Sequence, residues 1–74
     1  MSVPEEFVCK ITGVIMADPV VASDGYSYER TALKAYFEAH NTQSKHNTAV
    51  ELIPNVMFTN TALLGLITKF LRTN

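Results

Sequence analysis

The sequence predicts a small α+β domain in which two loops surround a short β-hairpin and a central helix, with a second helix at the C-terminal end. Three observations predict this fold. Residues 29–40 and 61–72 carry apolar side chains at the three- and four-residue spacing of a helix that faces a core. Residues 19–28 place strand-forming side chains on either side of Asp24-Gly25, a dipeptide typical of hairpin turns. Two segments without a regular period are expected to form the loops: 4–17 and 41–51.

Composition limits the chain to one small domain over residues 1–74. With 74 residues, 47% of them hydrophobic, it can build one core but not the two lobes of an enzyme whose active site lies between domains. The formal net charge of −1 gives no electrostatic attraction to nucleic acid. No apolar stretch is long enough to span a bilayer, and the acidic start is not a secretory signal. The sequence therefore predicts a cytoplasmic protein, monomeric or weakly dimeric, without membrane or nucleic-acid partners.

The single cysteine, Cys9, excludes an internal disulfide and with it a disulfide-stapled secreted scaffold. A structural zinc site usually has four Cys or His ligands, and Cys9, His40 and His46 are one short of that number. We therefore predict no metal and no other cofactor. Cys9 lies in an apolar segment, which favours a buried core thiol over a nucleophile activated by a histidine. Because a domain this small usually needs a staple, something else must hold the two loops.

The central helix is predicted over residues 29–40. Ser27 is a suitable N-cap, Glu29 suits the positive end of the helix dipole, and Asn41 is a suitable stop. His46, in the polar second loop, is expected to be exposed or to form part of an interface. The apolar stripe of the helix is predicted to consist of Leu33, Tyr36 and Phe37, with His40 one turn further on as a structural residue.

The second helix is predicted over residues 61–72, with Asn60 or Thr59 as its N-cap. Gly65 inside this helix costs about 1 kcal/mol relative to Ala, which indicates either close packing there or simple tolerance. The buried stripe is predicted to consist of Leu63, Leu66, Ile67 and Phe70, flanked by Leu64 and Leu71. The remaining core is predicted to include Phe7, Met16, Phe37, Leu52, Ile53, Val56, Met57 and Phe58.

Four segments, in order, resemble the U-box family. Pro4–Gly13 is similar to the family's opening, Pro-x-x-Phe-x-Cys-Pro-Ile-Thr, and Met16–Val21 continues the likeness. Gly25–Arg30 is similar to the family's Gly-x-Thr-Tyr-x-Arg, and Leu33–Phe37 lies where the family has Ile-x-x-Trp-Leu. None of these four segments alone is specific for the family, but together and in this order they cover nearly the whole chain.

Spacing decides how the C-terminal half aligns with the family. Leu52–Asn55 reads like the family's Leu-Ile-Pro-Asn, but the Ala-Leu and Leu-Ile pairs that follow in the family fit without a gap only after Asn60. Met57–Asn60 is therefore the equivalent segment. The same register places His46–Ala49 on the family's Pro-Val-Thr-Arg/Gly, and Glu51-Leu52 on its Pro-Leu.

The resemblance implies a fold similar to a RING finger but without zinc, in which hydrogen bonds and salt bridges hold the two loops. Such a network would replace the missing staple, because buried polar groups are paired and paired groups fix one geometry. The alternative is that the same side chains are ordinary cap and turn residues. The candidates for the network are Ser23, Asp24, Glu29, Arg30, Thr48 and Asn60.

The resemblance also implies a function, because U-boxes act as E3 ubiquitin ligases. In them the two loops and the central helix form a shallow groove that binds a ubiquitin-charged E2 conjugating enzyme, and a substrate lysine then attacks the thioester. By position, Ile11 is the exposed anchor of the first loop, Tyr36 is the helix contact and Val14 contributes to the rim. The alternative is that Ile11 and Tyr36 face the core, although a tyrosine can pack its ring and keep its hydroxyl in water.

Four positions depart from the family's binding pattern. Lys10, His46 and Glu51 stand in place of prolines, and Ala49 lies where active members often carry a basic residue that bridges E2 and ubiquitin. Loss of one charge-assisted hydrogen bond, about 1.5–3 kcal/mol, and of rigid prolines is expected to weaken E2 recruitment.

Two hypotheses therefore stand for the function. The first is an E3 ligase U-box that recruits an E2 and promotes ubiquitin transfer. The second is a degenerate U-box that binds a substrate or another protein without useful E2 affinity. The second would suit one U-box of a tandem pair, an architecture found among effector ligases that bacteria deliver into host cytoplasm, but a divergent eukaryotic U-box fits the irregular motif equally well.

Overall fold

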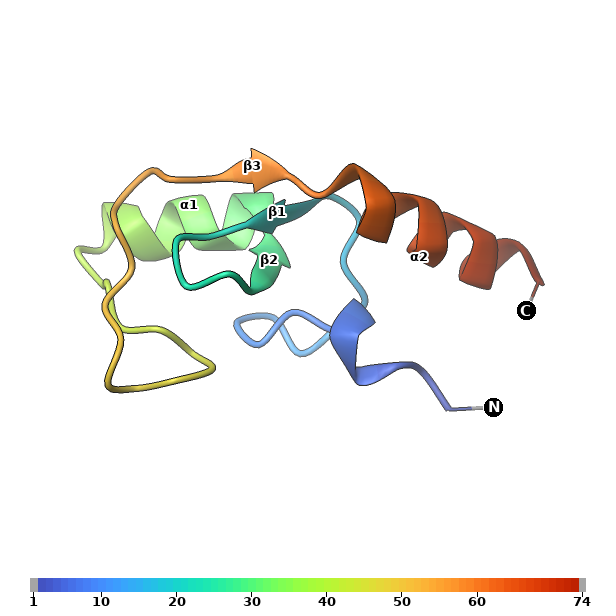
Figure 1. The fold of residues 1–74 in the computed structure, drawn as a ribbon, viewed down its shortest axis with the longest axis horizontal. Coiled ribbons are helices and arrows are strands. Elements are labelled where there is room, and N and C mark those ends of the chain that lie inside the picture. The colour runs from blue at the N-terminus through green and yellow to red at the C-terminus, as the bar shows by residue number, and fades with distance from the viewer. Residues whose placement is uncertain (1, 74) are drawn as a thin grey trace.

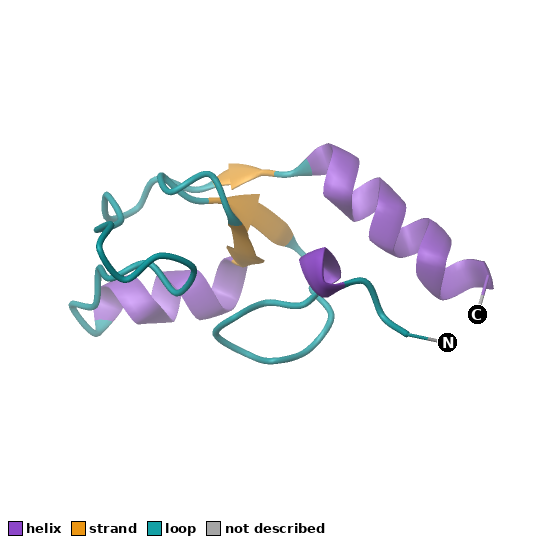
Figure 2. Cartoon of the chain, turned by 60° about the horizontal axis from the view of Figure 1, so that its bottom comes forward, coloured by secondary structure: helices purple, strands orange, loops and turns teal. Residues whose placement is uncertain are grey.

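The computed structural model describes residues 2–73, which form three short strands, two helices and one turn of 3₁₀ helix. In chain order these are η1 (Glu5–Phe7), β1 (Pro19–Val21), β2 (Ser27–Glu29), α1 (Arg30–Glu38), β3 (Phe58–Thr59) and α2 (Thr61–Thr73). The strands make one antiparallel sheet of order β2-β1-β3. Both views place the sheet between α1 and α2, and in Figure 1 the two long loops project below it (Figures 1 and 2). The predicted α+β fold is confirmed.

The hairpin forms where the Asp-Gly signal predicts it. β1 and β2 pair with Val20 opposite Tyr28, and both of these side chains are fully buried. The turn is closed by a hydrogen bond from the Ala22 N–H to the Tyr26 carbonyl at 2.9 Å. Gly25 has a φ of 83°, in the left-handed region that favours glycine, so this position explains the dipeptide.

The N-terminal end of α1 differs from the prediction, because tertiary partners compete for the expected capping side chains. Ser27 lies in β2, where its Oγ accepts a hydrogen bond from Asn60 Nδ2 at 3.0 Å. Glu29 is the N-cap residue with an extended backbone, and its side chain makes no capping bond. The prediction that Ser27 caps the helix is therefore wrong, and the helix begins one residue later than predicted, with Glu29 still at its N-terminal end.

α1 ends at Glu38, two residues earlier than predicted. His40 has a φ of 65°, its N–H donates to the Phe37 carbonyl, and the Asn41 N–H donates to the Tyr36 carbonyl. These two bonds form a Schellman motif, which satisfies the last carbonyls of the helix. His40 is consequently exposed and outside the helix, so its predicted place on the apolar stripe is wrong.

The core lies between the sheet, α1 and the inner face of α2. At its edge the Phe7 and Phe70 rings make a T-shaped contact, with their centroids 5.5 Å apart. Asn60 caps α2, since its Oδ1 accepts a hydrogen bond from the Leu63 N–H at 3.0 Å. The buried apolar residues are Phe7, Cys9, Met16, Val20, Ala22, Tyr28, Leu33, Phe37, Leu52, Leu63 and Ile67.

Three residues that the sequence assigns to the core are exposed instead. Ile53, Phe58 and Leu66 keep 61%, 69% and 57% of their surface in contact with solvent. Phe58 lies on a two-residue edge strand, and only the face of α2 that carries Leu63 and Ile67 meets the rest of the core. Helical spacing shows which apolar side chains share one face of a helix, but it does not show how much of that face the rest of the domain covers.

Within residues 2–73, neither helix has the length and apolar character needed to cross a bilayer.

Two leucines of α2 allow a matched test of this core. Truncation of buried Leu63 to Ala is expected to lower the free energy of unfolding by about 2–5 kcal/mol, because it leaves a cavity. The same truncation at exposed Leu66 is expected to change it by less than about 0.5 kcal/mol. Denaturant unfolding of the two variants measures the difference, and equal losses would contradict the packing described for α2.

Gly65 offers a gain in stability. A Cβ built at this position meets no atom within 4 Å, and the residue is exposed in the middle of α2. Replacing Gly65 with Ala is therefore expected to raise the free energy of unfolding by about 0.5–1 kcal/mol, because alanine loses less backbone entropy in a helix. A lower melting temperature for Gly65→Ala would show that the position needs glycine for a reason other than tolerance.

Candidate functional site

The first loop, residues 4–17, is held by the buried thiol of Cys9. The Sγ atom of Cys9 accepts hydrogen bonds from the backbone N–H groups of Ile11 at 3.4 Å and Glu29 at 3.3 Å. The Cys9 carbonyl accepts the Gly13 N–H at 2.8 Å, which closes the tip of the loop. Because Glu29 ends β2, one cysteine fixes both the shape of this loop and its position against the hairpin.

The Glu29 carboxylate holds the C-terminal end of the same loop. Its two oxygens accept the backbone N–H groups of Ala17 at 2.7 Å and Asp18 at 2.8 Å. Asp18 in turn pairs with the Arg30 guanidinium at 2.7 Å, and Arg30 also donates to Thr59 Oγ1. Glu29 and Arg30, neighbours in the sequence, therefore join the first loop, α1 and β3.

Asp24, in the hairpin turn, holds the second loop, residues 41–51. Its carboxylate accepts hydrogen bonds from the Tyr28 hydroxyl at 2.7 Å, the Ser44 hydroxyl at 2.7 Å and the Tyr26 N–H at 3.0 Å. Ser44 is fully buried, and its Oγ also accepts the backbone N–H groups of His46 and the residue after it at 3.1 Å. This places one ionised side chain at the junction of hairpin and loop.

Ser44 is a structural residue that the sequence analysis did not identify. A serine whose hydroxyl accepts the N–H groups two and three residues further on makes an ST-turn, and such turns are frequent in polar loops. A serine within a polar tract was therefore the only available signal, and it does not distinguish a buried hub from an exposed turn.

The remaining network candidates are less central. Ser23 Oγ accepts the Ile53 N–H at 2.7 Å, which attaches the segment after the second loop to the hairpin. Asn60 joins the start of α2 to β2 through its bond to Ser27. Thr48 is exposed and contributes its backbone carbonyl, which accepts a hydrogen bond from Gln43 Nε2 at 3.2 Å.

Tyr36 links α1 to the second loop. Its hydroxyl donates to the Gln43 carbonyl at 2.7 Å, and the Lys45 ammonium lies 5.7 Å from the centre of its ring. The ring is half-buried and packs against the core. Tyr36 therefore combines the two orientations that the sequence left open.

The residues expected to contact a partner differ in exposure. Val14 is 61% exposed, and Lys10 and Ala49 are also exposed. Lys10 pairs with Glu5 at 3.5 Å, an exposed ion pair that contributes little to stability. Ile11 is half-buried and packs against the core, so the expectation of a freely exposed anchor is corrected to a side chain shared between core and surface.

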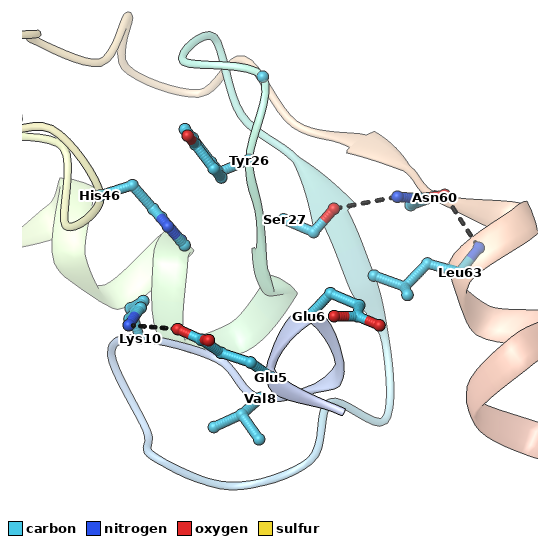
Figure 3. A pocket seen from close by; sticks show the side chains of 10 residues that line it. Glu5, Glu6, Val8, Lys10, Tyr26, Ser27, His46, Asn60 and Leu63 are labelled. Carbon is cyan, nitrogen blue, oxygen red and sulfur yellow. Dashed lines mark hydrogen bonds and ion pairs between the residues drawn. The ribbon is translucent and has the colours of Figure 1, made fainter. Parts of the chain in front are cut away.

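The sequence leaves two places open for His46, exposed in the loop or part of an interface, and the first does not hold because the side chain is half-buried. Its ring stacks on Tyr26 with centroids 3.9 Å apart and meets the edge of Tyr28 at 5.5 Å. It lines a cleft of about 390 Å³ between the first loop, the hairpin turn, the second loop and the start of α2. Figure 3 shows His46 and Tyr26 on one side of this cleft, with Lys10 and Glu5 below them. The structure thus brings Lys10 and His46, two of the residues expected to contact a partner, into the lining of the same cleft.

Within residues 2–73, no three His, Cys, Asp or Glu side chains gather closely enough to hold a metal ion.

The network shifts the pKa values of its members. Burial alone would raise the pKa of Asp24, but the hydrogen bonds from Ser44, Tyr28 and the Tyr26 N–H outweigh it and hold that pKa below its ordinary value. Burial, followed by the bond to Asp24, raises the pKa of Tyr28 to about 12. Burial also lowers the pKa of His46. At neutral pH the carboxylate is therefore charged and the two rings are neutral.

Comparison with known proteins gives one consistent result. A sequence model of the U-box domain matches residues 3–74. The chain is 40% identical over 73 residues to WD repeat, SAM and U-box domain-containing protein 1 of Gallus gallus, and 38% identical over 73 residues to that of Homo sapiens. These alignments cover 99% and 97% of this chain but 15% of each relative. U-box domain-containing protein 12 of Arabidopsis thaliana is 39% identical over 72 residues, which are 96% of this chain and 11% of the relative.

The network predicts a stability profile that falls at both ends of the pH scale. The folded-state pKa of Asp24 lies below the unfolded value of 3.8, so its contribution is present above 3.8 and is lost as the pH falls through the folded pKa. The folded-state pKa of Tyr28, about 12, lies above the unfolded value of 10.0, so its contribution is present below 10.0 and is lost as the pH rises toward 12. Urea unfolding at a series of pH values measures both limbs.

Two variants test which residue causes the loss of stability at each end of the pH profile. Asp24→Asn is expected to flatten the acid limb, and Tyr28→Phe the alkaline limb. An alkaline limb in Tyr28→Phe identical to that of the parent chain would contradict the assignment to Tyr28.

Proposed function

The chain belongs to the U-box family, and from this premise we propose that it acts as the E2-binding domain of an E3 ubiquitin ligase. The two loops and α1 form the docking surface for a ubiquitin-charged E2 conjugating enzyme. A lysine of a substrate held nearby then attacks the E2 thioester, and the chain forms no covalent intermediate. Its contribution is proximity and a restricted orientation of the thioester, effects that can lower a barrier by several kcal/mol. We propose the cytoplasm as the place of this ubiquitin transfer.

One observation carries this proposal: both loops are tied by hydrogen bonds to a single frame of hairpin and helix. Cys9 and Glu29 attach the first loop, while Asp24 and Tyr36 attach the second. A surface whose loops are ordered before binding loses less conformational entropy when a partner docks. This order supports a function that depends on presenting two loops at a fixed separation.

The apolar contacts of the proposed surface come from three places. Val14 provides an exposed side chain on the first loop, and Ile11 beside it is half-buried. Tyr36 presents part of its ring from α1. A few such anchors usually carry most of the affinity of an interface, and the rim contributes little.

The departures from the family's binding pattern set the expected strength of the interaction. Ala49 offers no hydrogen-bond donor from its side chain, and Lys10 adds a charge next to Ile11. His46 replaces a proline, but its ring contacts two tyrosine rings, which supports an ordered loop backbone at this position. We therefore expect weak rather than absent E2 binding, with a dissociation constant of roughly 0.1–1 mM, or about −5.5 to −4 kcal/mol.

NMR titration of the isotope-labelled domain with a panel of E2 enzymes tests the proposal. Saturable shifts are expected at residues 10–14, 36 and 45–50, together with faster discharge of ubiquitin from the charged E2 to free lysine. Val14→Ala and Ile11→Ala are expected to weaken binding, the second by about tenfold or more. Leu66→Ala, an exposed leucine truncated on α2, is the matched control and should bind like the parent chain.

The titration also separates the two functional hypotheses. If no E2 shifts any resonance or gains activity while the spectrum stays that of a folded domain, the ligase function is wrong. A domain of that kind would serve as a binding module for a substrate or for another protein. Melting curves of each variant show whether a loss of binding reflects the surface or the fold, which matters most for half-buried Ile11.

A further inference from the structure

The second loop contacts the hairpin at His46 through an aromatic stack. The His46 and Tyr26 rings lie 3.9 Å apart and are parallel to within 4°. The Tyr28 ring also contacts the His46 ring, in a T-shaped arrangement with centroids 5.5 Å apart. In Figure 3 the two stacked rings stand at the border between the hairpin turn and the second loop.

His46 is the inward-facing side chain of the outer part of this loop. Of residues 45–51, all of which the structure describes, His46 is the one that is not exposed. Backbone hydrogen bonds from Lys45 to Tyr28 Oη and from His46 to Ser44 Oγ flank the ring. The stretch that follows, up to Val50, is held by short-range bonds within the loop. Ser44, which is bonded to Asp24, holds the start of this stretch to the hairpin turn, and the stack is the contact that its own side chains add.

The surroundings of the ring suit a neutral imidazole. The Nε2 atom of His46 is buried and has no hydrogen-bond partner among residues 2–73. A neutral ring with its proton on Nδ1 leaves only a lone pair at that atom. A second proton would place a charged N–H there without an acceptor, which is far more costly than an unused lone pair.

Three charged groups face the ring from the elements around it. Asp24 in the hairpin turn and Glu5 in η1 favour a protonated ring, while Lys10 in the first loop opposes it. Burial is the largest effect and also opposes protonation, so the pKa of His46 lies below its ordinary value of 6.5. Asp24 has a lowered pKa and stays ionised while His46 titrates.

We propose that His46, stacked on Tyr26, is the positioning residue that holds the second loop in its partner-binding conformation, and that protonation of this ring releases the loop. The folded-state pKa of His46 is lowered, so the stacked conformation is fully stabilised above pH 6.5 and loses that stabilisation as the pH falls further. The effect on E2 binding rests on the proposed function, whereas the release of the loop does not. Binding of an E2 to this surface would thus weaken at mildly acidic pH.

Amide hydrogen exchange read by NMR tests the release directly. Between pH 7.5 and 5.5, the protection factors of residues 46, 47, 49 and 50, corrected for intrinsic exchange, are expected to fall several-fold, because protonation of the ring disfavours the stacked conformation. The amide of Leu64, bonded to the Asn60 carbonyl in α2, serves as the internal reference and should not change.

Four variants isolate the ring. His46→Phe keeps an aromatic stack without a titratable group, and its loop should stay protected at both pH values. His46→Ala and Tyr26→Ala remove the stack and should resemble the acidified parent chain already at pH 7.5. His40→Asn removes the other histidine, exposed and at a φ of 65° that asparagine tolerates, and should leave the pH response intact.

The E2 titration repeated at both pH values separates this inference from the proposed function. Binding that weakens at pH 5.5 in the parent chain but not in His46→Phe supports both. If no E2 binds at either pH while exchange in the loop still follows His46, the positioning role stands and the ligase function fails. If loop protection in the parent chain does not change with pH, or if His46→Phe responds to acid as the parent chain does, the inference is overturned.

Discussion

The carboxylate of Asp24 is the contact on which the arrangement of the second loop depends. It accepts hydrogen bonds from the Tyr28 and Ser44 hydroxyls and from the Tyr26 N–H, so one side chain joins the hairpin turn to a loop 20 residues further along. Because Ser44 is fully buried, a different loop position would leave its hydroxyl without a partner in the interior. The loop is therefore fixed by the need to satisfy polar groups, and its few apolar side chains contribute little.

The first loop follows the same principle with other chemistry. The Cys9 thiol and the Glu29 carboxylate each accept backbone N–H groups of the loop, and Arg30 carries the connection on to Asp18 and Thr59. Charged groups that are half-buried are tolerated because each is paired, and the pairing permits one geometry. In a chain of 74 residues with a single cysteine, such networks take the part that disulfides play in other small domains.

The proposed docking surface draws its properties from these ties. Tyr36 stands on α1 and bonds the second loop, while Val14 projects from the first loop. His46 occupies a position where the register of the U-box resemblance places a proline, and here two tyrosine rings contact its side chain. A proline restricts the backbone at any pH, whereas under the proposed release of the loop the stacked imidazole does so only while it is neutral.

By itself the sequence determined the α+β class, the hairpin at Asp24-Gly25, both helices and the U-box likeness, because turn chemistry, helical period and motif order are local properties of the chain. Only the tertiary structure decided that Ser44 is a buried hub, that His46 packs inward and that Phe58 faces solvent. These outcomes depend on which partners lie opposite a side chain after folding. A serine in a polar tract or a phenylalanine in an apolar one has the same local signature whether the chain later covers it or leaves it exposed.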